Sequence, residues 1–153
     1  FLVIGKTSER YLSEGMAQFE SRLKHYSPFE TIVVPDIKGG GKRTAEVLKE
    51  LEFEAFRKHF QPGDWMVLLD EKGKRYTSRG FAQQMQKWMN AGPKRLVFIV
   101  GGAFGFSPKM YEKANGLLSM SEMTTSHQLI RVVFLEQIYR AFTILNNEPY
   151  HND

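Results

Sequence analysis

Two segments of the chain carry residue types whose spacing is suited to chemistry. The first is a glycine-rich loop, Gly101-Gly102-Ala103-Phe104-Gly105, which follows the five consecutive apolar residues 96–100. Ser107 and Pro108 then supply a helix N-cap with proline at the first helical position. A strand that is apolar on both faces is normally a central parallel strand, and glycines at its carboxyl end let backbone amides approach a ligand closely. We therefore expect the ligand site at this loop.

The second segment contains His127 and Arg131, which are four positions apart across the expected start of the last helix. Both side chains are expected to face the loop that precedes this helix. The ordinary interpretation of a histidine beside a helix N-terminus is a capping or solvated residue. Arg131 heads the apolar stripe of the helix, so its guanidinium must either extend to solvent or meet an anion such as a phosphate.

The polar segment 147–153 ends the chain and contains the pair Tyr150-His151. By default such a terminal segment is expected to be disordered. An aromatic residue followed by histidine can also stack on a nucleic-acid base. Both interpretations of this pair stay open at the level of the sequence.

A glycine-rich basic segment, 36–43, combines three glycines with the cations Lys38, Lys42 and Arg43. It lacks the glycine and the Ser or Thr that a phosphate-binding P-loop requires, because Ile37 and Arg43 occupy those places. A mobile basic loop that touches an RNA backbone and an ordinary solvated loop remain as the two interpretations.

Apolar patterns along the chain predict five strands that alternate with helices. We expect the strands at 1–4, 31–35, 65–69, 96–100 and 117–121, with a polar loop at 70–75 after the third. We expect the helices at about 11–26, 44–60, 77–90, 108–115 and 129–146. This order predicts one α/β domain, 1–153, with a largely parallel sheet and helices on both faces. Ligands bind outside the carboxyl ends of such strands, which here are followed by the loops after Leu69, after Val100 and at 120–127.

Composition narrows the possible classes of function. The 153 residues include no cysteine, which excludes disulfides, thiolate zinc sites and a thiol nucleophile and fits a reducing cytoplasm. No apolar run is long enough to span a membrane, and no His-x-x-x-His pair or carboxylate cluster suggests a metal. The net charge of +4 weakly favours a polyanionic binding partner.

A dinucleotide site is one alternative for the glycine loop, because Glu122 lies 20 positions after Gly102. The first two glycines are adjacent rather than separated, and only one strand follows, so half of a dinucleotide fold is missing. A purely structural tight turn is the other alternative.

The chain closely resembles the ribosomal RNA large subunit methyltransferase H family, the small single-domain members of the SPOUT class, which methylate N3 of a pseudouridine in large-subunit rRNA. The resemblance spans essentially the whole chain. Its motifs are Val100-Gly101-Gly102-x-x-Gly105, Leu117-x-Ser119-x-Ser121, His127-x-Leu129-x-Arg131-Val132, Glu136-Gln137-x-Tyr139-Arg140-Ala141 and Asn147-x-Pro149-Tyr150-His151. Where family members often carry Pro-Glu or Pro-Tyr between the glycines, this chain has Ala103-Phe104.

The resemblance implies a C-terminal trefoil knot whose loops bind S-adenosylmethionine. It also implies a homodimer with the RNA site between subunits. Glycines at 101, 102 and 105 would keep the approach open, and backbone contact is favoured at Glu122. The implied cofactor positions are Leu69, Gly101, Gly102, Gly105, Met120, Ser121, Glu122, Met123, Thr124 and Thr125.

The implied reaction is methyl transfer to a ring nitrogen that must lose its proton, so positioning should supply much of the rate. Our hypothesis is that His127 or His151 assists the proton loss, while Arg131 and Arg140 hold phosphate or stabilise the imidate. His151 could act on the site of the other subunit. Candidates for contacting RNA are Lys38, Lys42, Arg43, Lys72, Lys74, Arg75, Arg140 and Tyr150.

Small size without an added RNA-binding module favours the assembled ribosome as substrate. A non-enzymatic RNA- or ribosome-binding dimer on the same scaffold is the second hypothesis. A nucleotide-binding oxidoreductase is the third.

Overall fold

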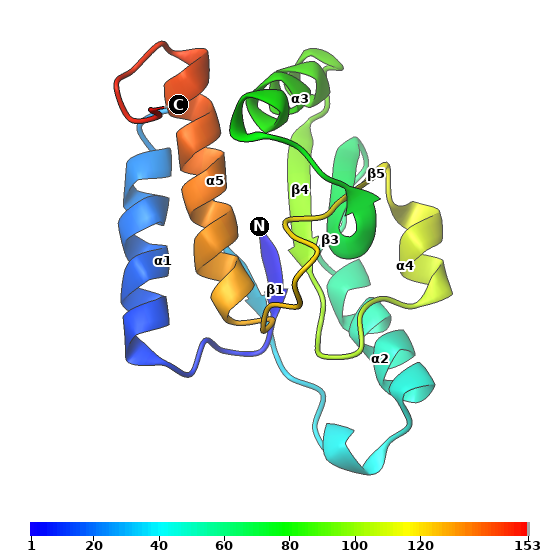
Figure 1. Cartoon of the computed structure of the whole chain (residues 1–153). Helices are drawn as coiled ribbons and strands as arrows, with labels where there is room; N and C mark the ends of the chain where they lie inside the picture. The colour runs from blue at the N-terminus through cyan, green and yellow to red at the C-terminus, as the bar shows by residue number, and fades with distance from the viewer. Residues whose placement is uncertain (153) are drawn as a thin grey trace.

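The computed structural model describes residues 1–152. Its single sheet has five strands in the order β2-β1-β4-β3-β5, and every pairing between these strands is parallel (Figure 1). The strands are β1 (Leu2–Ile4), β2 (Ile32–Val34), β3 (Asp64–Lys74), β4 (Arg95–Val100) and β5 (Gly116–Leu118). The helices are α1 (Arg10–Leu23), α2 (Ala45–Arg57), α3 (Ser78–Asn90), α4 (Pro108–Lys113) and α5 (Leu129–Leu145), with a 3₁₀ turn η1 at Gly40–Lys42. The predicted α/β class with a largely parallel sheet is confirmed.

Helices cover both faces of the sheet, as the alternation of strands and helices predicts. Helices α1, α3 and α5 pack on one face, and α2 and α4 pack on the other (Figure 1). Successive side chains of β3 divide between the two cores, because Val67 joins the first and its neighbours Met66 and Leu68 join the second. Both faces of the central strands are therefore buried, which explains their continuous apolar sequence.

Side-chain caps set the starts of three helices close to the predicted positions. Thr44, Thr77 and Ser107 each have extended backbone and accept a hydrogen bond from the backbone N–H three positions later. Such caps satisfy one of the free N–H groups at the helix start. The N-cap expected at Ser107 is confirmed, and α2 and α3 begin within one residue of their predicted starts.

The segment after Leu69 corrects one prediction. Residues 70–74 were expected in a polar loop, but β3 continues through them with a register shift between Leu69 and Lys74. Leu118 of β5 pairs with both of those residues, so the segment curls around the end of β5. An added Cβ at Gly73 would lie 2.5 Å from backbone atoms of Leu118, so only glycine permits this approach. The trefoil knot implied by the resemblance stays a prediction.

Among the described residues, no helix is both long and apolar enough to cross a membrane.

Candidate functional site

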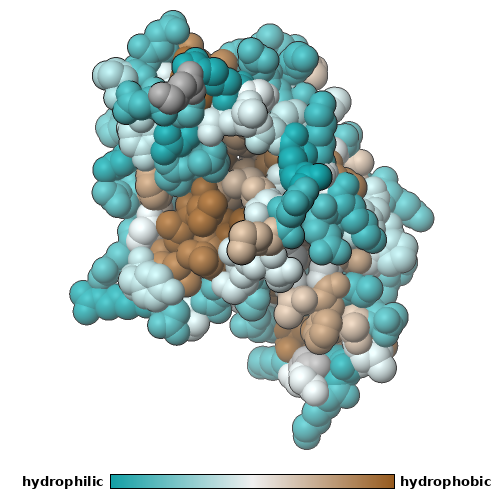
Figure 2. Space-filling view, in the orientation of Figure 1, coloured by the Kyte–Doolittle hydropathy of each residue, from teal (hydrophilic) through white to brown (hydrophobic). Residues whose placement is uncertain are grey.

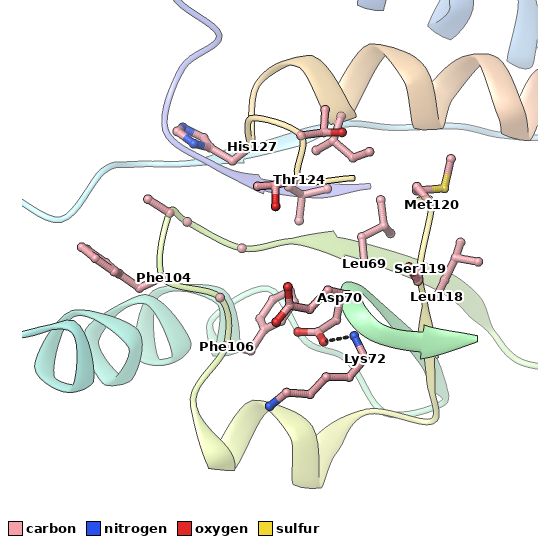
Figure 3. A pocket seen from close by; sticks show the side chains of 18 of the residues that line it. Leu69, Asp70, Lys72, Phe104, Phe106, Leu118, Ser119, Met120, Thr124 and His127 are labelled. Carbon is pink, nitrogen blue, oxygen red and sulfur yellow. Dashed lines mark hydrogen bonds between the residues drawn. The ribbon is translucent and has the colours of Figure 1, made fainter. Parts of the chain in front are cut away.

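A cavity of about 920 Å³ lies at the carboxyl ends of β3, β4 and β5 (Figure 3). Its walls come from the end of β3, the glycine loop after β4 and the segment that joins β5 to α5. Parallel strands end at the same edge of a sheet, which is why three segments far apart in sequence meet here. All ten residues that the resemblance implies for the cofactor line this cavity. Their role as cofactor ligands stays a prediction.

The glycine loop forms a narrow turn at the end of β4. The N–H of Gly105 donates to the carbonyl of Gly102 at 3.2 Å, which leaves Ala103 and Phe104 exposed at the tip. Gly105 has φ of +77°, a conformation that disfavours any other residue. Phe104 is 57% exposed, and its ring turns away from Leu69 and Leu118 (Figure 3).

The opposite wall is the segment from Ser119 to His127. The Ser119 hydroxyl donates to the Ser121 carbonyl at 3.2 Å, and the Ser121 hydroxyl accepts the Met123 N–H at 2.9 Å. These local bonds hold the segment in a turn, and Met123 is 81% exposed. The backbone of this wall is therefore ordered by its own serines.

Charged side chains around the cavity are mostly acidic. Four carboxylates and two ammonium groups line it, from Asp70, Glu71, Glu112, Glu122, Lys49 and Lys72. The Tyr111 hydroxyl donates to Asp70 at 2.6 Å, and the Lys72 ammonium lies 5.4 Å from the centre of the Tyr111 ring. Burial, followed by the bond to Asp70, raises the pKa of Tyr111. This excess of carboxylates favours a cationic ligand.

His127 lies at the rim of this cavity, on the segment that leads into α5 (Figure 3). Burial lowers the pKa of its imidazole below the ordinary 6.5, and the charge of Arg131 lowers it further, while the charge of Asp36 acts in the opposite direction. The ring is therefore neutral at pH 7, with a nitrogen able to accept a proton.

The model of a family described as "Predicted SPOUT methyltransferase" matches residues 1–151. The chain belongs to the SPOUT methyltransferase family. Three relatives named ribosomal RNA large subunit methyltransferase H align over 152 residues, which are 99% of this chain and 97% of each relative. The identity is 53% to the protein from Parabacteroides distasonis, 47% to that from Bacteroides fragilis and 44% to that from Porphyromonas gingivalis. The resemblance to this family inferred from the motifs is confirmed.

The environment of Arg131 differs from both expected environments. Its side chain has no exposed surface, so it does not extend to solvent, and its hydrogen bonds go to neutral oxygens, while the Asp36 carboxylate acts on it only through its charge. The guanidinium donates to the carbonyls of Ile4, Gly5 and His127 and to the Thr7 hydroxyl. With all three nitrogens bonded inside the protein, Arg131 fixes the start of α5 to the carboxyl end of β1. A direct contact with phosphate or an imidate is not what this arrangement provides.

The predicted RNA-contacting cations of this SPOUT methyltransferase divide into three groups. Lys72 lines the cavity, while Lys74 lies over the Tyr76 ring and Arg75 pairs with Glu122. Lys38, Lys42 and Arg43 are exposed on and beside η1, which precedes α2 in the chain. Arg140 lies elsewhere, near the C-terminal end of α5. The structure therefore gathers some of these residues near the cavity and leaves others apart.

The C-terminal segment packs against α5, contrary to the default expectation of disorder. The Tyr150 ring contacts the Tyr139 ring at 4.7 Å, and its hydroxyl donates to Glu136 at 3.1 Å. Arg140 pairs with Glu136 and contacts Nδ1 of His151 at 3.2 Å. Asp153 lies outside the described residues.

His151 is far from the cavity of its own chain. Its contact residue Arg140 lies 11 residues along α5 from Leu129, which is about 16 Å at 1.5 Å per residue. The structure therefore does not bring His127 and His151 together within one chain.

Sequence reasoning missed three residues at this site. Asp70 and Tyr111 form a hydrogen-bonded pair in the cavity wall, and Asp70 could have been found because it directly follows the apolar part of a strand. Glu52 is buried in α2 and accepts a hydrogen bond from the Gly102 N–H, and no feature of the sequence separates it from the neighbouring glutamates.

Within residues 1–152, no cluster of His, Asp and Glu side chains suits a metal ion.

Proposed function

We propose that this SPOUT methyltransferase transfers a methyl group from S-adenosylmethionine to N3 of a pseudouridine in 23S ribosomal RNA, on the assembled ribosome in the cytoplasm. The observation that carries the proposal is the cavity at the carboxyl ends of three parallel strands, closed by the glycine loop and by residues 120–125. The relatives named above, with their shared function in ribosomal RNA methylation, support the choice of substrate class.

The residues of the cavity fit S-adenosylmethionine in shape and charge. Leu69, Leu118 and Met120 supply apolar wall for an adenine ring, and glycines at 101 and 105 leave the backbone open to it. The acidic lining suits the sulfonium and ammonium charges of the cofactor. Ser121, Thr124 and Thr125 add hydroxyl groups for its polar atoms.

When bound, the cofactor supplies a methyl group that is open to attack by a ring nitrogen. His127 is the residue that this chain offers to take the N3 proton, because its imidazole is neutral and lies at the rim of the cavity. The walls would hold the base in line with the methyl group, and such positioning accounts for much of a methyl-transfer rate.

Binding to ribosomal RNA is proposed to use Lys72 at the cavity together with the exposed cations Lys42 and Arg43 on and beside η1. Such phosphate contacts position the protein without reading sequence, and they make affinity fall steeply with salt. A salt-independent affinity for ribosomes would argue against these contacts.

A homodimer is part of this proposal. Apolar side chains gather over α5 on one face of the molecule, where Leu129 and Val133 are both exposed (Figure 2). In a dimer built on this face, His151 of one subunit is proposed to act at the site of the other, and its distance from the cavity of its own chain supports this assignment.

The experiment that tests the proposal begins with calorimetric titration of S-adenosylmethionine, S-adenosylhomocysteine and NAD. We expect the first two to bind and NAD not to bind. The protein is then incubated with unmodified ribosomes, separate large subunits and naked 23S RNA, each with isotopically labelled S-adenosylmethionine, and RNA digests are analysed by mass spectrometry. Label in N3-methylpseudouridine from whole ribosomes is the expected result. Ribosome binding without label would instead support the non-enzymatic dimer.

A further inference from the structure

Of the three glutamates at positions 50, 52 and 54 of α2, only Glu52 is buried in the protein. Its residue surface is 8% exposed, although charged side chains are rarely buried without a partner. Its neighbours pair with cations at the surface, Glu50 with Lys109 and Glu54 with Arg57. The burial of Glu52 therefore has a reason that the rest of the helix does not share.

The partner of Glu52 is the backbone of the glycine loop. Its carboxylate accepts the N–H of Gly102 at 3.3 Å, across 50 positions of sequence. An added Cβ at Gly102 would lie 2.3 Å from Oε1 of Glu52. Glycine at 102 and glutamate at 52 thus fit each other, because any side chain at 102 would displace the carboxylate from its bond.

This bond fixes more than one N–H group. A trans peptide holds its C=O and N–H antiparallel, so anchoring the Gly102 N–H also sets the direction of the Gly101 carbonyl. Both glycines line the cavity. Burial raises the pKa of the Glu52 carboxyl group, and the hydrogen bond from the Gly102 N–H lowers it. The second effect arises because this bond stabilises the charged carboxylate.

We propose that Glu52 is a positioning residue that holds the Gly101-Gly102 peptide in the cavity wall and thereby sets the affinity for the methyl donor. The affinity part rests on the proposed function, whereas the positioning of the peptide does not. Glu52 lies behind the loop and acts only through it.

The test compares Glu52→Ala, Glu52→Gln, Gly102→Ala and the double variant Glu52→Ala/Gly102→Ala, with Glu54→Ala as a matched surface control. We expect Glu52→Ala to raise the calorimetric Kd and the KM for S-adenosylmethionine about tenfold with kcat changed less than about twofold, since one hydrogen bond to a charged group is lost. Glu52→Gln keeps an acceptor oxygen and should stay within about threefold of wild type.

Gly102→Ala should resemble Glu52→Ala, because its methyl group displaces the carboxylate. The double variant should be no weaker than the worse single variant, since both changes break the same bond. The proposal would be overturned if the losses of affinity in the two single variants multiplied in the double variant. It would also be overturned if Glu52→Gln bound S-adenosylmethionine as weakly as Glu52→Ala.

A second measurement separates this proposal from the proposed function. Amide hydrogen exchange of Gly102 in the ligand-free protein should quicken about tenfold in Glu52→Ala and stay unchanged in Glu54→Ala. Unchanged exchange would overturn the positioning role. Faster exchange in a protein whose wild type binds no S-adenosylmethionine would leave the positioning role standing and refute the proposed function. Glu52→Gln and the loop variant Gly102→Ala keep the test decisive if Glu52→Ala does not fold.

Discussion

Two arginines on α5 lie nine positions apart and have opposite environments. Arg131, at the start of the helix, is fully buried, and its guanidinium donates to three carbonyls and one hydroxyl. Arg140, near the end, keeps 24% of its side chain exposed, pairs with Glu136 and lies over the Tyr150 ring. The same residue type therefore acts as an internal brace at one end and as an adaptable surface charge at the other.

The difference follows from the oxygens that each end of the helix meets. The start of α5 approaches the carboxyl end of β1, where Arg131 donates to the carbonyls of Ile4, the last residue of the strand, and of Gly5, which follows it. The end of α5 meets the folded-back segment with Glu148, Tyr150 and His151, and its Phe142 ring stacks on the Tyr26 ring. We infer that the start of the helix holds the cavity in shape, whereas the end is free to rearrange on binding RNA.

The largest expected effect comes from removing the buried guanidinium. Arg131→Met leaves several acceptors unsatisfied in the interior, so we expect a loss of at least about 3 kcal/mol in the free energy of unfolding. Arg140→Met removes a partly exposed ion pair and should cost no more than about 1 kcal/mol. Urea unfolding of both variants measures the contrast. Equal losses would remove the distinction between the two ends.

The second prediction compares the two histidines at these ends. His127→Ala should slow single-turnover methylation of ribosomes about 100-fold, the size of a lost general base, while the Kd for S-adenosylmethionine changes little. His151→Ala should also leave that Kd unchanged, because its ring is remote from the cavity of its own chain. If both variants retained wild-type rates, neither histidine would assist the proton loss.

The pH dependence provides a check on His127. Because its folded pKa is lowered below 6.5, the imidazole stays neutral and able to accept a proton to a lower pH than a free histidine. Single-turnover rates should therefore fall on the acid side only below pH 6.5.

A mixing experiment tests whether the site is shared between subunits. If His127→Ala and His151→Ala are each slow alone, an equal mixture should restore about a quarter of the activity, because half of the dimers are mixed and one of their two sites keeps both rings.

Sequence patterns predicted the parts of the fold that depend on local signals. Continuous apolar strands, glycines and helix caps are visible within a few residues, which is why the sheet, the glycine loop and the start of α4 at Ser107 could be placed. The charges of residues 70–74 predict a loop, although these residues continue β3. Their strand pairs with Leu118 of β5, which lies more than 40 positions later in the sequence. Strand pairing of this kind is not local and leaves no periodicity.

The candidate site shows the same division. The three loops that line the cavity follow strand ends and could be placed from the chain alone, whereas the individual cofactor positions were implied by the family resemblance. The partners of Arg131 and Glu52 could not, since the carbonyl of Gly5 and the N–H of Gly102 are backbone groups supplied by distant segments. Side-chain type predicts a charge, while only the fold decides which backbone group meets it.

The smallest expected effect lies at the end of α5. Tyr26 donates its hydroxyl to Glu148, and its ring stacks on Phe142 at 5.4 Å. The bond to Glu148 raises the pKa of Tyr26, with burial adding to the effect. Tyr26→Phe removes the bond and keeps the stacking, so unfolding should become easier by only about 0.5–1 kcal/mol.

Release of Glu148 should instead appear in RNA binding, as a modest change in KM for ribosomes at constant Kd for S-adenosylmethionine. Thermal unfolding and methylation kinetics measure the two effects side by side. A loss above about 2 kcal/mol would mean that the C-terminal segment belongs to the rigid core, because an exposed hydrogen bond alone contributes less than that. The end of α5 would then resemble its start, and the adaptable role of Arg140 would have to be abandoned.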